Sequence, residues 1–232
     1  MKNIRHYTLI WLLSLLVIGM GRAAEKVAVA TKVSGLVNLT KSAKAKSKSS
    51  TLQPGAILED GDFIKTGGDG FVALVFIDDK SSLKIKENTE LEITGKRQAA
   101  SIAKKINLDH GTLRAQVTKQ VKGDFIVATP TSVASVKGTD FWMISDPIQG
   151  DQLIGLNGVV ELMNVFSGMA MDITGGFTGN SLADGGLTSD VTIPETIPDD
   201  PDEETEQSKK SILKIQFQGP DNTVKTLIIE YQ

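Results

Sequence analysis

The sequence predicts an all-β protein, and three observations support this fold class. Short segments of alternating apolar and polar residues follow one another along most of the chain, as in strands with one buried face. Turn residues separate these segments, and the chain has 22 glycines. Only residues 96–105 suit a helical turn, and a long hairpin loop fits them equally well. We expect a sandwich or rolled antiparallel sheet, with a β-solenoid-like fold as the alternative because strand–turn units recur about every 8–12 residues.

The N-terminus has the organisation of a secretory signal. Lys2 and Arg5 precede an almost entirely apolar run at residues 7–20, and Gly21-Arg22-Ala23 places small residues where a signal peptidase cleaves. A membrane anchor, the alternative, needs about 20 apolar residues to span a bilayer. We therefore expect residues 1–23 to be a cleaved signal peptide, with no membrane span afterwards and a periplasmic or extracellular location.

Composition excludes several classes of protein. The chain has no Cys, which rules out disulfides, thiol chemistry and acylation of a lipoprotein cysteine. The formal net charge is −3, and removing residues 1–23 makes it more negative because that segment carries three cations and no acid. An acidic chain of this kind is not expected to bind nucleic acid. Export without disulfides is typical of a bacterial envelope protein that is stabilised by its own core.

Residues 24–174 are predicted to form the main β domain, which begins with short strands at 27–30 and 33–39. Residues 41–50 contain no large apolar side chain and predict an exposed loop, with a basic anion-binding patch as the alternative. Residues 71–77 are apolar on both faces, which indicates a central or doubly covered strand. Residues 82–86 and 89–93 alternate strictly, so each is expected to have one wet face.

The second half of this domain is expected to contain two hairpins. In the first, Asp109-His110-Gly111 turns the chain between residues 106–108 and 112–117. In the second, Asn157-Gly158 joins residues 153–156 to 159–163, because both central residues of a type I′ turn need positive φ. Further strands are expected at 125–128, which ends before Pro130, at 141–144 and at 169–173.

The C-terminal part of the chain divides into a linker and a hairpin. Residues 175–207 are rich in Gly, Asp, Pro and Thr, so we expect a flexible acidic linker. Its carboxylates suggest calcium as an alternative, although their spacing does not match an EF-hand. Residues 208–232 are expected to form a β-hairpin. Because a lone hairpin is marginal in water, it should dock on its own domain, on a second copy by self-association, or on the sheet edge of a partner.

Four motifs follow one another in residues 33–164: GDFIKTG at 61–67 with the strand at 73–76, INLDHGTL at 106–113, TPT at 129–131 with VKGTDF at 136–141, and LNGVVEL at 156–162. Their order resembles the FecR domain of periplasmic signalling proteins. The resemblance implies an envelope location and a β module.

Members of this family sense an outer-membrane transporter and control a sigma factor through a cytoplasmic segment ahead of a transmembrane helix. Only six residues precede the apolar run here, so the resemblance is not expected to extend to that regulatory function. Lys137 also stands where the family usually has Arg, and Lys does not replace a bidentate Arg contact.

The motif around Gly138 has two interpretations. As a structural feature, Pro130 fixes a corner, and Gly138 permits a bulge or positive φ where small residues let two backbones approach. As a functional feature, Lys137 and Thr139 form a polar contact site, since Gly in a strand also marks close approach by a ligand.

Catalysis is not expected. After removal of residues 1–23 the chain has one histidine, His110, in a predicted exposed turn, and no known catalytic motif accompanies it. We predict no catalytic, cofactor-binding or metal-binding residues and no cofactor. A glycosidase with paired carboxylates stays open as an uncharacterised hydrolase, although aromatic residues, which sugar clefts need, are 5% of the chain.

Together these observations predict a non-catalytic binding or scaffold module that recognises an envelope protein or cell-wall glycan. The alternative is a periplasmic signal-transduction component that works with a separate membrane or sigma-regulatory partner.

Overall fold

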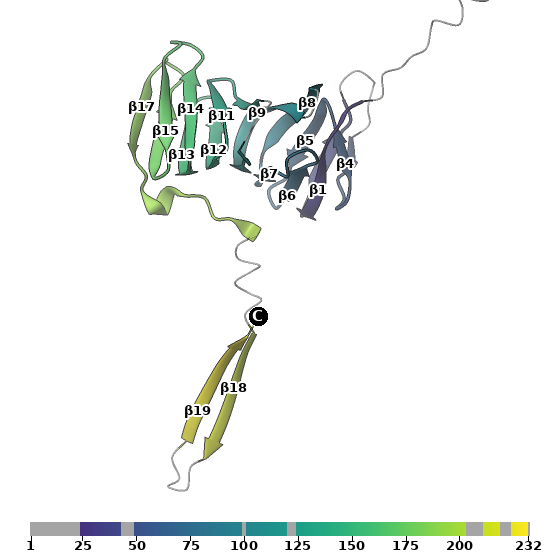
Figure 1. The fold of residues 1–232 in the computed structure, drawn as a ribbon, viewed down its shortest axis with the longest axis vertical. Helices are drawn as coiled ribbons and strands as arrows, with labels where there is room; N and C mark the ends of the chain where they lie inside the picture. The colour runs from purple at the N-terminus through teal and green to yellow at the C-terminus, as the bar shows by residue number, and fades with distance from the viewer. Residues whose placement is uncertain are drawn as a thin grey trace, which may run out of the picture.

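The computed structural model describes residues 24–42, 49–98, 101–119, 124–202, 211–218 and 224–231. As predicted, the fold is all-β: hydrogen bonds join the strands β1 to β17 into one 17-stranded sheet, which is rolled into two layers (Figure 1). All ladders between the described strands are antiparallel except the one between β9 (Ser101–Gln116) and β10 (Phe125–Ala128). The architecture is therefore the rolled antiparallel sheet and not a solenoid.

The two layers, which we call A and B, share the long strand β9. Layer A has the strand order β4 (Ile57–Glu59), β1 (Lys26–Ser34), β6 (Phe71–Phe76), β7 (Ser82–Ile85), β9, β12 (Asp140–Asp146), β13 (Gly150–Asn157), β16 (Phe177–Ser181) and β17 (Leu187–Val191). Layer B has the order β3 (Ser49–Thr51), β2 (Val37–Thr40), β5 (Asp62–Thr66), β8 (Glu90–Gln98), β9, β10, β11 (Ser132–Val136), β14 (Val159–Asn164) and β15 (Ala170–Thr174).

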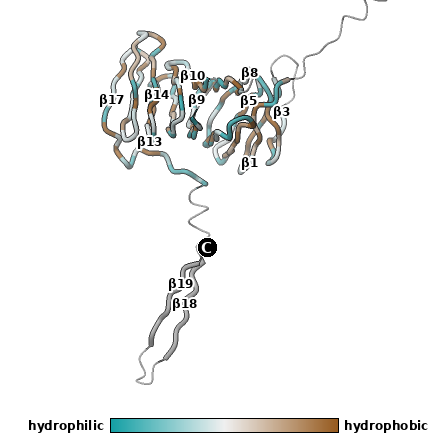
Figure 2. The backbone as a smooth tube through the Cα atoms, viewed as in Figure 1, coloured by the Kyte–Doolittle hydropathy of each residue, from teal (hydrophilic) through white to brown (hydrophobic). Residues whose placement is uncertain are grey.

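The core lies between the layers, where the apolar residues of the alternating segments meet. Leu83 and Ile85 of β7 are fully buried, as their alternation predicted. Phe76 of layer A meets Phe125 of layer B edge to face, with ring centroids 5.6 Å apart. Figure 2 shows the hydrophobic residues concentrated along the strands of the roll. Removal of this apolar surface from water drives the two layers together.

A buried lysine ties the turn at 78–79 to β9. The Lys104 Nζ lies 2.8 Å from carboxylate oxygens of both Asp78 and Asp79, and its ammonium sits 5.4 Å from the centroid of the Phe76 ring. The side chain of Lys104 is fully buried. Because a buried ammonium is tolerated only when it is paired, the two acids of this turn are structural.

The predicted hairpin at Asp109-His110-Gly111 is wrong, because the chain continues through it as one strand. Residues 104–110 of β9 pair in layer B, and Gly111 to Gln116 pair in layer A. Gly111 has a φ of 107°, and this backbone conformation carries the strand from one layer to the other. The helical turn considered for residues 96–105 is also wrong, since β8 and β9 occupy the described part of that segment as a hairpin.

The predicted hairpin at Asn157-Gly158 is likewise wrong. The strand before it, β13, pairs with β12 and β16 in layer A, whereas β14 after it pairs with β11 and β15 in layer B. Gly158 has positive φ as predicted, but it forms a corner between layers instead of a turn between paired strands. A tight turn thus specifies a change of direction and leaves open which strand becomes the neighbour.

The prediction of a flexible linker at 175–207 is wrong for its first part. Residues 177–191 contain β16 and β17, and β16 pairs with β13. This hairpin was missed because its buried side is built of small residues. A Cβ on Gly179 would lie 2.6 Å from Cδ1 of Ile173 in layer B, so no larger side chain fits there. Residues 192–202, which follow β17, lie against layer A and include the 3₁₀ turn η2 (Pro194–Thr196). We call residues 192–202 the acidic strap.

Several sequence predictions fall on other parts of the chain. The signal peptide at 1–23, residues 43–48 of the predicted loop and residues 203–210 of the predicted linker lie outside the described residues. Strands β18 (Ser211–Gln218) and β19 (Val224–Tyr231) form an antiparallel pair, and the docking of residues 208–232 stays a prediction. Within the described ranges, no helix has the length and apolarity to cross a bilayer.

Candidate functional site

A row of residues crosses the outer face of layer A, one from each neighbouring strand. Each member lies directly opposite the next in the strand register. From β1 to β16 the row reads Lys32, Ala73, Lys84, Arg114, Trp142, Ile154 and Thr178. Three of these residues are cations, and we call Lys32, Lys84 and Arg114 the cationic stripe.

The acidic strap runs along this row (Figure 1). Its first residue, Thr192, shares a 2.9 Å hydroxyl hydrogen bond with Thr178, and its last, Asp202, lies 2.7 Å from the Nζ of Lys32. Six strand spacings of about 4.8 Å separate Thr178 from Lys32, or about 29 Å. Seven extended steps of about 3.3 Å and three steps of about 2.0 Å in the 3₁₀ turn reach about 29 Å, so the strap has just the length needed to cross the layer.

Two carboxylates of the strap contact the cationic stripe. Asp200, 7% exposed, lies 2.7 Å from the Nζ of Lys84 and 2.6 Å from Nη1 of Arg114. Asp202 lies 3.4 Å from the Nζ of Lys84 and 2.7 Å from the Nζ of Lys32. The strap therefore neutralises the three cations of the stripe.

Two large apolar residues of the outer face are buried near the strap. Trp142 and Ile154 point away from the interior, because they share their face with Arg114, yet they are 1% and 0% exposed. Both lie between the two ends of the strap in the row. The guanidinium of Arg114 lies 5.8 Å from the Trp142 ring centroid, in the range of a cation–π contact.

The environment of Asp200 changes its acidity. Burial raises the pKa of Asp200, but hydrogen bonds from Lys84, the amide of Asp202 and Arg114 together with the charge of Lys84 outweigh burial, so its pKa lies below the ordinary 3.8. A lowered folded pKa means that the docked strap is stabilised above pH 3.8, and that this stabilisation is lost as the pH falls through the folded value. Asp202 and Asp140 contact the same cations as Asp200.

We expect the strap to stay docked at neutral and mildly acidic pH and to be released only when the pH falls below the ordinary carboxyl value of 3.8. Trp142 is the reporter, because the only other tryptophan, Trp11, lies in the predicted signal peptide. Iodide quenching of Trp142 fluorescence should rise only in the acidic range. Quenching that already rises between about pH 7 and 5 would contradict the assignment to a carboxylate of lowered pKa.

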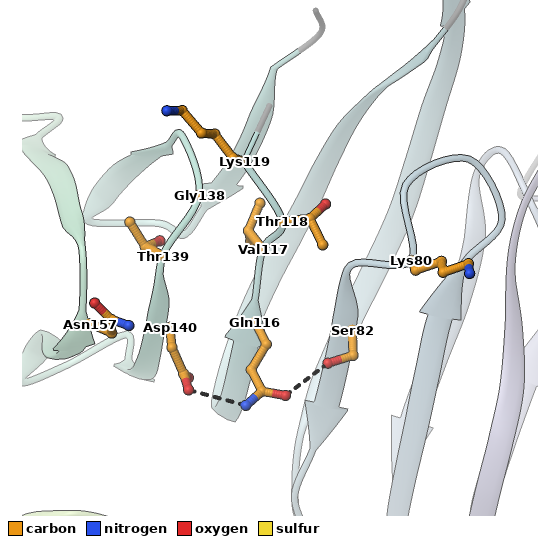
Figure 3. A pocket seen from close by; sticks show the side chains of 10 residues that line it. All are labelled: Lys80, Ser82, Gln116, Val117, Thr118, Lys119, Gly138, Thr139, Asp140 and Asn157. Atoms are coloured by element: carbon orange, nitrogen blue, oxygen red, sulfur yellow. Dashed lines mark hydrogen bonds between the residues drawn. The ribbon is translucent and has the colours of Figure 1, made fainter. Parts of the chain in front are cut away.

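An open groove of about 390 Å³ adjoins the stripe at the ends of strands β7, β9, β12 and β13 (Figure 3). We call it the Gly138 groove, and it is lined by Lys80, Ser82, Gln116, Val117, Thr118, Lys119, Gly138, Thr139, Asp140 and Asn157. Its shape depends on Gly138, whose φ is 103°. A Cβ there would lie 2.8 Å from the Cα of Lys119, so only glycine lets these two main chains approach.

Hydrogen bonds connect the groove to the strap. Ser82 donates to Gln116 at 3.2 Å, and Gln116 donates to Asp140 at 3.1 Å, as Figure 3 shows. Asp140 then accepts two hydrogen bonds from Arg114, at 3.0 Å from Nε and 2.9 Å from Nη2. Since Arg114 also donates to Asp200, an unbroken series of contacts leads from the wall of the groove to the strap.

Thr139 lies at the groove with an unsatisfied hydroxyl. Its side chain is 6% exposed, and Oγ1 has no hydrogen-bond partner among the described residues. A buried hydroxyl without a partner costs about 1–3 kcal/mol. The wall of the groove thus carries a residue with an unsatisfied polar group.

The structure separates the two residues of the predicted polar contact site. Thr139 lines the Gly138 groove, whereas Lys137 lines a second hollow on the outer face of layer B, beside Glu161 and Asp172. Successive residues of a strand point to opposite faces, so residues 137 and 139 share a face only where the strand is regular. Gly138 interrupts that regularity, and the two side chains serve different surfaces.

The other predicted site residues are also placed. His110 lies partly exposed in β9 opposite Glu90, not in a turn. Of the acidic run, Asp200 and Asp202 contact cations of the protein instead of forming a calcium site, and the described ranges contain no group of three metal-ligating side chains. Sequence reasoning missed Lys84 and Arg114. In the sequence each of them is simply a charged residue on the solvent-facing side of a predicted strand. Most strands have such residues, so the pattern does not mark a site.

Residues 62–161 match the protein family described as FecR protein. These residues form a FecR domain. The resemblance found in the sequence is therefore confirmed. The FecR domain extends from β5 into β14 and contains every residue that lines the Gly138 groove, together with Lys84 and Arg114 of the stripe. Lys32 and the acidic strap lie outside it.

Two crystal structures resemble the chain, each of a candidate anti-sigma factor from Parabacteroides distasonis. One covers 56% of this chain and 59% of its own length, with 15% identity and a TM-score of 0.46. The other covers 69% and 70%, with 14% identity and the same TM-score. This chain thus spans about 59% of the length of the first structure. The comparison with curated proteins gives no match.

Proposed function

We propose that the protein is an exported, non-catalytic binding module whose FecR domain holds a segment of a partner protein in the Gly138 groove. The observation that supports this most directly is the buried hydroxyl of Thr139, which has no hydrogen-bond partner among the described residues. Main-chain amides and carbonyls of an extended segment are the groups that such a groove binds. The groove has no aromatic side chain, which favours a protein over a cell-wall glycan as the partner.

Export supports the same proposal. The signal-like N-terminus and the absence of cysteine suit the periplasm or the cell exterior, where the partner would be an envelope protein. Fractionation of cells that make the full chain tests this step. Recovery of uncleaved protein in the cytosol would refute it.

Replacing Thr139 with Val tests the groove. Val keeps the shape of Thr and removes the unsatisfied hydroxyl, so the variant should be about 1 kcal/mol more stable than the wild type. It should also retain less partner, because a contact made only in the complex is lost. A gain in stability with a loss of function is the pattern expected of a binding residue. Urea unfolding gives the stability, and crosslinked capture from an envelope fraction gives the binding.

A pair of charge reversals completes this experiment. Lys119→Glu alters the groove, whereas Lys137→Glu alters the hollow on layer B. The proposal requires that the band captured by the wild type weaken with Thr139→Val and Lys119→Glu and persist with Lys137→Glu. Equal retention by all three variants would exclude the groove as the binding site.

A second candidate function is signal transduction with a separate membrane or sigma-regulatory partner. The contacts that lead from Gln116 through Asp140 and Arg114 to Asp200 favour it, because they join the groove to a segment outside the FecR domain. A transducer needs two states. Faster hydrogen exchange in the strap when the groove is occupied would support this function, and identical exchange would argue against it.

A further inference from the structure

The cationic stripe is built independently of the strap that covers it. Asp140 holds the guanidinium of Arg114 through two hydrogen bonds, and the ring of Trp142 lies beneath it. The ammonium of Lys32 lies 5.6 Å from the centroid of the Phe71 ring. Neither arrangement uses an atom of the strap. Arg114 and Lys32 are therefore already positioned to receive carboxylates if the strap leaves, and a preorganised site binds at a lower entropic cost.

The strap is attached mainly by side chains. Its main chain makes no sheet ladder with layer A in the described residues. Lys86 donates to the carbonyl of Asp199, and the amides of Thr196, Ile197 and Asp202 bond within the strap itself. Residues 193–196 are exposed. The carboxylates of Asp200 and Asp202 and the Lys86 hydrogen bond therefore hold the strap near one end, and Thr192 holds it at the other. Segments held by few contacts open at low cost.

We propose that the cationic stripe is a binding site for an acidic, extended segment of a partner protein, and that the acidic strap is its resident occupant. The strap indicates the chemistry of the ligand, which is a pair of carboxylates two residues apart. Asp200 and Asp202 both contact Lys84. Asp200 also contacts Arg114, and Asp202 also contacts Lys32. The residue between them is Pro201, which restricts the segment. Figure 2 shows this end of the strap as hydrophilic.

Competition with the strap determines how tightly a separate acidic segment binds the stripe. A tethered occupant acts at an effective concentration in the millimolar range, so a free segment of the same sequence binds the wild type weakly. A partner succeeds by adding contacts elsewhere on the protein. The stripe and the groove are separate surfaces, so this proposal does not depend on what the groove binds.

The test uses the exported chain without residues 1–23 and a fluorescent peptide with the sequence of residues 195–204. The double variant Asp200→Asn/Asp202→Asn removes the carboxylates of the strap and leaves the stripe intact. This variant should bind the peptide at least about tenfold more tightly than the wild type, because no tethered carboxylate competes. Binding should weaken with added salt, since it is electrostatic.

Two controls assign the binding to the stripe. Adding Lys84→Met to the double variant should weaken binding about tenfold, whereas adding Lys137→Met, a cation on layer B, should leave it unchanged. A peptide with Asn at both Asp positions should not bind. Equal affinity of wild type and double variant, indifference to Lys84→Met, or no binding at all would overturn the proposal and leave the strap as a structural clamp.

Wild-type protein provides a second measurement if the double variant loses its β spectrum. Saturating peptide should displace the strap and speed amide hydrogen exchange in residues 192–202, followed by mass spectrometry, and unchanged exchange would refute the proposal. This test is independent of the groove. If the peptide does not bind the stripe, the expected effects of Thr139→Val and Lys119→Glu on partner capture still stand. If those two variants do not affect capture, the expected binding of the peptide to the stripe still stands.

Discussion

Replacing Gly111 with Ala is expected to cost about 4 kcal/mol of unfolding free energy, a large part of the roughly 5–15 kcal/mol that holds a typical domain folded. Two effects add. A φ of 107° is strained for any residue with a Cβ, and the new Cβ would lie 2.3 Å from Oγ1 and 2.5 Å from Cα of Thr89. Thr89 cannot move away, because its amide donates to Thr66 and its hydroxyl accepts from the amide of Thr112.

A matched glycine separates the two effects. Gly55 also has positive φ, at 83°, but a Cβ there would meet nothing within 4 Å. Gly55→Ala therefore measures the backbone term alone, about 1 kcal/mol. Urea unfolding followed by circular dichroism gives both values. If the two variants lose the same stability, the crossing of β9 between layers does not depend on close contact at Gly111.

The outcome at Gly111 bears on what a sequence of this kind predicts. Alternation along residues 82–86 and 89–93 correctly identified strands and their buried faces, because a strand must bury every second side chain wherever it lies. The same local signals misassigned Gly111 and Asn157-Gly158 as hairpins. Positive φ at a glycine is equally suited to a tight turn and to a corner between layers, and the choice is made by pairing with distant strands.

The β16–β17 hairpin and the strap were missed for related reasons. Composition marks a segment as unable to fold when it lacks large apolar residues of its own. Gly179 is buried because Ile173 fills the space above it, and Asp200 is buried because Lys84 and Arg114 come from strands far away in sequence. Such segments are ordered by the surface that receives them. The Gly138 groove was partly foreseen, since Thr139 and the positive φ of Gly138 were predicted, but its other wall comes from β7 and β9.

Asp200→Asn is expected to release the strap, at a cost of about 3 kcal/mol in the free energy of its docking. The amide of Asn carries no charge and cannot balance the charges of Lys84 and Arg114. Two cations beneath a docked strap without the Asp200 carboxylate are unfavourable. The strap should therefore depart, so that water solvates both cations. A change of this size increases the population of the open state about 100-fold. Trp142 should then become accessible to iodide at neutral pH.

Asp199→Asn is the control, because its position is adjacent and its charge is the same. The Asp199 side chain is exposed and only its main-chain carbonyl contacts Lys86, so this variant should resemble the wild type in quenching. Equal quenching in both variants would show that the net charge of the strap, and not a specific buried carboxylate, holds it in place. Accessible Trp142 in Asp200→Asn alone would instead mean that a single ion-paired residue determines whether the aromatic and cationic face of layer A is covered.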